Sequence, residues 1–348
     1  MCGGQREAGA LQMNVEIPHP RAVFDYLGGE RVEGAFQGAI DRRRLHHAWL
    51  LSGPQGVGKA TFAYRAARRL MGATPDSDLG LLGSRPGDPV CRQIAARAHP
   101  DLIVLQRDPE DGRTRKAIPV EEARALPEFF SKTPASAPFR VAIIDTADDL
   151  NRFGANAVLK IIEEPPDRGV IFLISNAEGG LLPTLRSRCR RMRFSVPPAE
   201  GARQWLAARA GIAQSEADKL LIIAGGAPGR AWRLGTMGAA EADHAARELL
   251  RSLPRVDETE MLALADGFRG PAGSERFNIL FERLADQIRA MTTDQAIAGE
   301  AGEGASGALD RWAQAWELLV QLPREVEGLN LDRVDAFYTV LSQLRAIA

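Results

Sequence analysis

The sequence predicts an α/β domain with a parallel sheet, followed by two regions made only of helices. Two observations support this fold class. Between about residues 18 and 195, short apolar runs alternate with helix-like stretches, which is typical of a parallel sheet covered on both faces. After Ser195 no further strand-like run follows, and amphipathic helical patterns continue toward the C-terminus.

Five short, nearly continuous apolar runs are the predicted strands, because buried parallel strands lack the alternation of polar and apolar residues. The runs are Ala48–Ser52, Asp101–Leu105, Arg140–Asp145, Val170–Ser175 and Arg190–Phe194. Helices are predicted over residues 61–71 and 151–164. The second of these stops at Pro165 and Pro166, which cannot continue a helix.

The helical remainder divides into two predicted domains. Pro197 and Pro198 mark a linker into a small helical domain over residues 196–237. Its predicted helices are near 199–210 and 214–224, with a third starting at about Ala227. The C-terminal domain, residues 238–348, shows amphipathic stretches separated by breaks such as residues 299–307, and these stretches are 241–252, 257–268, 274–290, 308–322 and 330–346. Residues 1–17 are predicted to form a loose tail before an α/β domain over residues 18–195.

Composition excludes several classes of protein. The 348 residues include 44 basic and 45 acidic side chains, so the net charge of -1 gives no basic field for binding nucleic acid unaided. Three widely spaced cysteines predict neither a disulfide framework nor a metal site. Without an apolar run of about 18 residues or a secretion signal, we expect a cytoplasmic protein with no membrane partner.

A glycine-rich loop joins the first predicted strand to the first predicted helix. A strand, this loop and a helix in that order are the context of a Walker A phosphate loop, in which backbone amides surround the phosphates and the lysine neutralises their charge. The predicted nucleotide contacts are Gly53, Gln55, Gly56, Val57, Gly58, Lys59, Ala60 and Thr61. A glycine-rich turn with no ligand is the alternative.

Two parts of a hydrolytic site are missing from the sequence. Ala60 stands where a Walker A loop normally has the serine or threonine hydroxyl that binds magnesium. Thr61 is the alternative ligand, but it lies about 100° further round the helix. Asp145, at the carboxyl end of a predicted strand, is suited to hold magnesium, yet the next residue is Thr146 instead of a carboxylate that could activate water. Asp148 is expected to cap the following helix.

Three further polar positions are candidate site residues. Arg188 lies in a basic run, and an arginine from a neighbouring subunit can stabilise the charge on a transferring phosphoryl group. A solvated or DNA-facing basic edge is the alternative for this run. Arg230 opens a helix and could reach a γ-phosphate, or lie on the surface. Asn176, after Ser175, could sense that phosphate or simply form a turn.

Taken together, these motifs resemble the clamp-loader family of AAA+ proteins found in bacterial DNA polymerase III. The resemblance covers about residues 18–235 and is carried by the phosphate loop, NRFGANAVLKIIEEPP, VIFLISNAEGGLLPTLRSRC and GGAPGR. It implies a RecA-like AAA+ domain, a helical lid and a collar domain for oligomerisation. It also implies that Arg188 is an arginine finger acting in trans, that Arg230 is a second sensor, and that ATP or ADP is a potential ligand.

The resemblance further implies partners. These are the gamma/tau and delta subunits of a hetero-pentameric ring, which opens a sliding clamp and loads it onto primed DNA as part of the DNA-directed DNA polymerase holoenzyme, a nucleotidyltransferase complex. The missing magnesium and base residues fit a subunit without intrinsic ATPase activity. Many relatives bind zinc through four cysteines after the phosphate-loop helix, but residues 72–100 retain only Cys91, so no zinc or other metal is predicted.

Two other functions remain open at this stage. A hydrolysing AAA+ subunit or related DNA motor would turn over ATP by itself, against which Ala60 and Thr146 argue. A P-loop kinase or other small-molecule transferase would leave the SRC run, residues 187–189, and the long helical part without a role.

Overall fold

The structure is a computed structural model that describes residues 17–107, 109–110, 113–114, 117–270, 273–297 and 303–347. The chain folds into two compact units, of which one ends at Ala231 and the other starts at Trp232. The predicted N-terminal tail lies outside the described residues, apart from Ile17. No helix in the described ranges combines the length and apolar character needed to cross a membrane.

The first unit contains a five-stranded parallel sheet in the order β2-β5-β6-β1-β7. Every predicted strand is confirmed to within one residue at each end. The strands are β1 (Ala48–Ser52), β2 (Leu102–Gln106), β5 (Arg140–Asp145), β6 (Gly169–Ser175) and β7 (Arg190–Arg193). A separate two-stranded antiparallel sheet pairs β3 (Pro109–Glu110) with β4 (Arg113–Thr114), and the sequence did not predict it.

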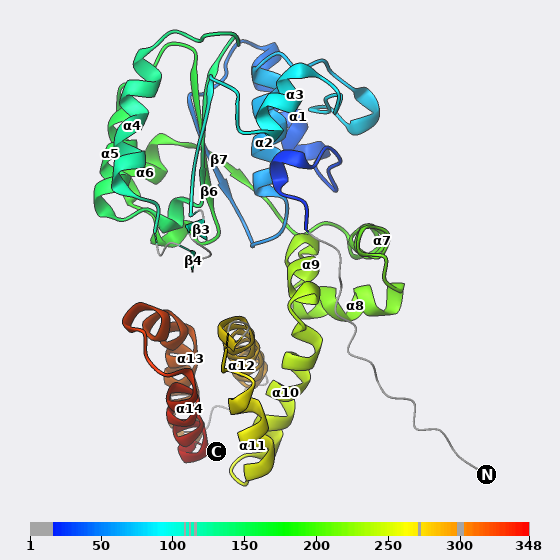
Figure 1. The fold of residues 1–348 in the computed structure, drawn as a ribbon, viewed down its shortest axis with the longest axis vertical. Coiled ribbons are helices and arrows are strands. Elements are labelled where there is room, and N and C mark those ends of the chain that lie inside the picture. The colour runs from blue at the N-terminus through cyan, green and yellow to red at the C-terminus, as the bar shows by residue number, and fades with distance from the viewer. Residues whose placement is uncertain are drawn as a thin grey trace, which may run out of the picture. The chain divides into compact units, whose positions relative to one another are not determined.

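Helices cover both faces of the five-stranded sheet (Figure 1). One layer contains α1 (Glu30–Asp41), α2 (Lys59–Leu70) and α3 (Pro89–Ala95), and the other contains α4 (Val120–Ser131), α5 (Arg152–Glu163) and α6 (Pro183–Arg188). Because successive side chains of a strand point to opposite faces, Trp49 of β1 packs in the core with α2 while Leu50 packs in the core with α5. Burial on both faces explains the continuous apolar runs.

The helical remainder agrees with the predicted pattern in its elements but not in every boundary. The first unit continues through α7 (Ala199–Ala210) and α8 (Gln214–Ile223), and α9 (Pro228–Thr236) crosses the boundary between the units. The second unit consists of α10 (Ala239–Ser252), α11 (Glu258–Asp266), α12 (Gly273–Ile297), α13 (Glu303–Leu329) and α14 (Arg333–Ile347). A break between helices was predicted over 299–307, but α13 already begins at Glu303, so the prediction is wrong for 303–307. Residues 299–302 lie outside the described residues. The division into three domains stays a prediction.

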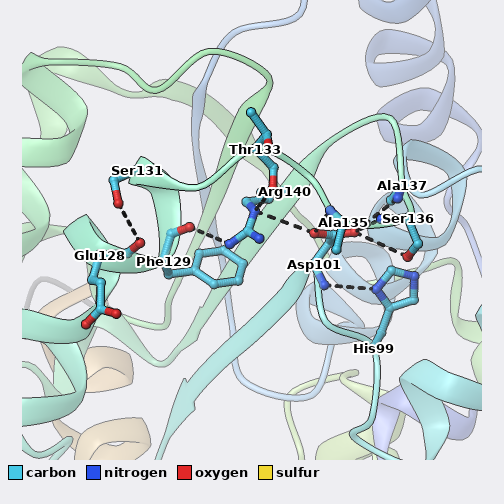
Figure 2. A network of polar contacts seen from close by, with 10 residues as sticks. All are labelled: His99, Asp101, Glu128, Phe129, Ser131, Thr133, Ala135, Ser136, Ala137 and Arg140. Carbon is cyan, nitrogen blue, oxygen red and sulfur yellow. Dashed lines mark hydrogen bonds and ion pairs between the residues drawn. The ribbon is translucent and has the colours of Figure 1, made fainter.

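A buried carboxylate fixes the loop between α4 and β5, as Figure 2 shows. Asp101 is fully buried before β2, and its carboxylate accepts hydrogen bonds of 2.7, 2.8 and 3.0 Å from the backbone amides of residues 135–137. Arg140 Nε lies 3.5 Å from Asp101 Oδ1, and its guanidinium lies over the Phe129 ring. Burial by itself would raise the pKa of Asp101. The hydrogen bonds from these amides and the charge of Arg140 outweigh burial, so the pKa lies below its usual range.

Candidate functional site

The glycine-rich loop leads from β1 directly into α2, as predicted for a phosphate loop. Gly58 precedes the helix with a φ of 93°, a left-handed conformation that glycine adopts readily. Gly56 also has a positive φ, of 81°, and a β-carbon there would lie 2.1 Å from the backbone nitrogen of Arg230. Both glycines are therefore required by conformation, and Gly56 also by the close approach of α9.

The predicted phosphate-binding lysine is held by the protein itself. Lys59 is only 4% exposed, and its Nζ donates to the carbonyl oxygens of Gly53 at 2.6 Å and Pro54 at 2.7 Å. Its third hydrogen bond, of 2.8 Å, goes to Oδ1 of Asn176. An ammonium group has three donors, so binding a phosphate would require at least one of these bonds to be exchanged. Burial lowers the pKa of Lys59 to about 8, although the charges of Asp145 and Asp148 oppose this.

Asp145, the last residue of β5, and Thr146, which follows it, differ in environment. Burial raises the pKa of Asp145 to about 6, with Lys59 lowering it and Asp149 raising it. The Thr146 hydroxyl donates to Asp149 Oδ2 at 2.9 Å, and Asp149 forms an ion pair of 2.9 Å with Arg107. Thr146 is therefore engaged in the turn after β5 and supplies no carboxylate that could accept a proton from water.

Asp148 has a role that the sequence prediction missed. Its carboxylate accepts hydrogen bonds from Ser175 Oγ at 2.7 Å and from the Asn176 amide at 2.6 Å. The predicted cap role is wrong, because Asn151 caps α5 by accepting from the amides at positions 153 and 154. Since β5 and β6 are parallel neighbours, their carboxyl ends meet. The sequence shows two consecutive predicted strands here, but it does not show that they pair. Asp148 thereby positions Asn176 beside Lys59.

The N-terminus of α9 packs directly onto the phosphate loop. The Gly229 amide donates to the Gly56 carbonyl oxygen at 2.9 Å, so the two glycines bring the backbones together. The backbone of the predicted second sensor, Arg230, is consequently next to the loop. What its guanidinium binds in a nucleotide complex stays a prediction.

Arg188, the predicted arginine finger, contacts Glu163 and Thr184. Neither of these is a residue of the phosphate loop. Arg188 is the last residue of α6, and its Nη2 forms an ion pair of 3.0 Å with Glu163, the last residue of α5. Its Nη1 donates to the Thr184 carbonyl oxygen at 3.2 Å. Both charged side chains are 43% exposed. The next residue, Cys189, is buried, and burial raises the pKa of its thiol to about 12. The sequence prediction missed Glu163, although it belongs to the EEPP run.

In the part of the chain that the structure describes, no group of three or more His, Cys, Asp or Glu side chains is arranged to hold a metal ion. Cys91 is buried, and its Sγ donates to Ser84 Oγ at 3.4 Å. Burial raises the pKa of this thiol. The absence of zinc stays a prediction.

Comparison with known proteins adds independent observations. The family model described as DNA polymerase III, delta subunit, matches residues 28–198. The chain is 34% identical over 225 residues to DNA polymerase III subunit delta′ of Pseudomonas aeruginosa, which covers 64% of this chain and 62% of that protein. It is 30% identical over 217 residues to subunit gamma/tau of Mycobacterium bovis, covering 60% of this chain and 36% of that protein. The chain thus spans less than two thirds of the length of these relatives.

Among solved structures, a DNA polymerase III gamma subunit-related protein from Thermotoga maritima aligns with a TM-score of 0.43 and 16% identity, covering 89% of this chain and 99% of that one.

With a phosphate loop after β1 of a parallel sheet and helical regions following it, the chain is a P-loop protein of the AAA+ class. Within that class, residues 28–198 match the family described as DNA polymerase III, delta subunit, and the chain is similar to DNA polymerase III subunit delta′.

Proposed function

We propose that the chain is a clamp-loader subunit that supplies an arginine to a neighbour's ATP site and hydrolyses little or no ATP itself. The supporting observation is an asymmetry between two parts of the first unit. The candidate nucleotide site lacks a hydroxyl at Ala60, in α2, and a carboxylate at Thr146, after β5, and all three donors of Lys59 are already bonded. Arg188, in contrast, keeps a half-exposed guanidinium.

The residues of the phosphate loop are suited to bind a nucleotide but not to catalyse its hydrolysis. Backbone amides at the start of α2 and the Lys59 charge suit phosphate, and ATP or ADP is the proposed ligand. Asp145 alone among the expected magnesium-binding groups is present, so the metal would be held weakly. Bound magnesium would neutralise phosphate charge there. The contacts of Lys59 with Gly53, Pro54 and Asn176 oppose nucleotide entry, because phosphate has to replace at least one of them.

The proposed partners follow from the similarity to DNA polymerase III subunits delta′ and gamma/tau. We propose that the chain joins gamma/tau and delta subunits in a hetero-pentameric ring, with the second, helical unit as the collar. Through that ring it would act on a sliding clamp and primed DNA in the cytoplasm. The nearly balanced charge of the chain agrees with DNA contact that is shared with other subunits.

Reconstitution tests this proposal. The purified chain should form a stable complex with the gamma/tau and delta subunits of its own organism on size-exclusion chromatography. The isolated chain should show no ATPase above background, while the complex should hydrolyse ATP and load a clamp onto primed DNA. Failure to enter the complex would contradict the assembly proposal, and ATP turnover by the isolated chain that is lost in Lys59→Ala would contradict the silent site.

Restoring the missing groups is expected to create measurable activity. The double variant Ala60→Thr, Thr146→Glu returns a magnesium ligand and a general base to the same pocket. General base catalysis alone contributes about 10² to 10⁴ in rate, so we expect turnover to rise at least about tenfold above the parent in an isolated-chain ATPase assay. Ala60→Ser with Thr146→Gln, which restores a hydroxyl but no base, is the matched control and should stay at the parent level.

A hydrolysing clamp-loader subunit is the second candidate function, because gamma/tau subunits also match the chain at 30% identity. The two candidates differ in a single measurement. A hydrolysing subunit turns over ATP before assembly, whereas the proposed finger donor affects turnover only in the complex.

A further inference from the structure

A cavity of about 200 Å³ lies beside β2, which forms one edge of the five-stranded sheet. Its polar lining comes from Arg21, Tyr64, Arg97, His99 and Gln106, and apolar side chains of α3 and β2 complete the wall. No residue of the phosphate loop, Gly53 to Thr61, lines it. The cavity is therefore distinct from the nucleotide site.

The lining of this cavity is suited to an anion. Two guanidinium groups, which carry only donors and stay charged at any physiological pH, face the same space. Tyr64, His99 and Gln106 add neutral groups that can donate hydrogen bonds. Among the described lining residues there is no carboxylate. Two cations and no anion in one small cavity predict a ligand with negative charge.

Arg21 supplies a second, independent observation. Its Nη1 is buried and has no hydrogen-bond partner among the residues that the structure describes. Buried polar atoms are nearly always paired, so the Arg21 guanidinium gains a hydrogen bond if it turns toward an acceptor in the cavity. The backbone of Arg21 is held in place, since Arg68 donates to its carbonyl oxygen. The side chain is thus presented to the cavity from a fixed segment.

We propose that this cavity binds a terminal phosphate group, as inorganic phosphate or a phosphomonoester. Two guanidinium groups match the double negative charge of a terminal phosphate better than the single charge of a carboxylate, and each can bond two of its oxygens. An internal phosphodiester carries one charge and continues in both directions, which a cavity of about 200 Å³ does not accommodate. The phosphate can come from a free small molecule or from the end of a nucleic-acid strand.

Titration calorimetry with inorganic phosphate on the full-length chain tests the proposal without any partner subunit. We expect saturable binding of one phosphate, and at least about a tenfold weaker Kd in Arg21→Gln and in Arg97→Gln, since hydrogen bonds to charged groups are the strong ones. Arg92→Gln is the matched control, because Arg92 is an exposed arginine of α3 that does not line the cavity. Unchanged thermal unfolding shows that each variant is folded.

The phosphate loop must be separated from the cavity in the same experiment. Lys59→Ala removes the loop's cation, and the cavity's affinity for phosphate should not change. Phosphate binding that is lost in Lys59→Ala but kept in both arginine variants would overturn the proposal, as would the absence of saturable binding.

Two further ligands distinguish the sources. Tighter binding of a 5′-phosphorylated oligonucleotide than of its unphosphorylated form, lost in Arg21→Gln, supports a strand end, and equal Kd values for inorganic phosphate and a nucleoside monophosphate support a small molecule. Because the assay uses the isolated chain, its outcome does not depend on the proposed clamp-loader function.

Discussion

Replacing Arg188 with alanine is expected to abolish ATP hydrolysis at one site of the reconstituted ring while leaving assembly intact. An arginine supplied in trans stabilises charge on the transferring phosphoryl group and contributes about 10³ to 10⁵ in rate at the site it serves. Arg188 ends α6 with its side chain half-exposed, so alanine leaves no buried cavity in the core. Single-turnover ATP hydrolysis by the complex should lose the phase that belongs to that site, and size-exclusion chromatography should show an unchanged complex.

Two variants in the same region serve as controls. Arg193→Ala removes an exposed arginine that pairs with Glu178, and it should leave hydrolysis unchanged. Glu163→Gln removes the carboxylate that holds Arg188 in the isolated chain. A half-exposed ion pair is worth at most about 1 kcal/mol, so this variant should change hydrolysis by less than about fivefold. Equal loss of activity in Arg188→Ala and Arg193→Ala would identify a general basic edge instead of a finger.

Replacing Asp101 with alanine is expected to cost about 3 to 5 kcal/mol of the free energy of unfolding. The change leaves the backbone amides of residues 135–137 without their acceptor and Arg140 without its buried anion. Each of these amide donors would then be buried without a hydrogen-bond partner, because water cannot reach it. Urea unfolding at pH 7, followed by tryptophan fluorescence, to which buried Trp49 in the same unit contributes, measures the effect.

The Asp101 prediction also has a pH signature. The pKa of this carboxyl is lowered in the folded protein, so its contribution is present above the unfolded value of about 3.9 and is lost as the pH falls through the folded value. The stability difference between the parent and Asp101→Ala should therefore shrink below about pH 4. Glu128→Ala, which breaks the exposed pair with Lys132 in the same region, is the control and should not shift the unfolding midpoint. A pH-independent difference would show that lost packing, not the ionised carboxylate, causes the effect.

Much of the fold and of the loop could be predicted because the information is local. Apolar runs bounded by turns located all five strands of the large sheet, and the order strand, Gly53 to Lys59, helix located the phosphate loop. The short sheet of β3 and β4 was missed because two-residue strands carry no periodicity. Asp148 was misassigned because a capping residue and a residue that bridges two strands have the same sequence signature.

The sequence by itself determined which chemical groups this protein possesses: a phosphate loop with Lys59, an alanine and a threonine at two positions of the hydrolytic machinery, and Arg188 in the SRC run. Only the tertiary structure decided how they are engaged. Lys59 bonds Asn176, 117 positions away, and Arg188 pairs with Glu163 on another helix. Such partners are set by which strand ends and helix ends meet in space, and hydrogen bonds and ion pairs of about 3 Å depend on that packing and not on sequence spacing.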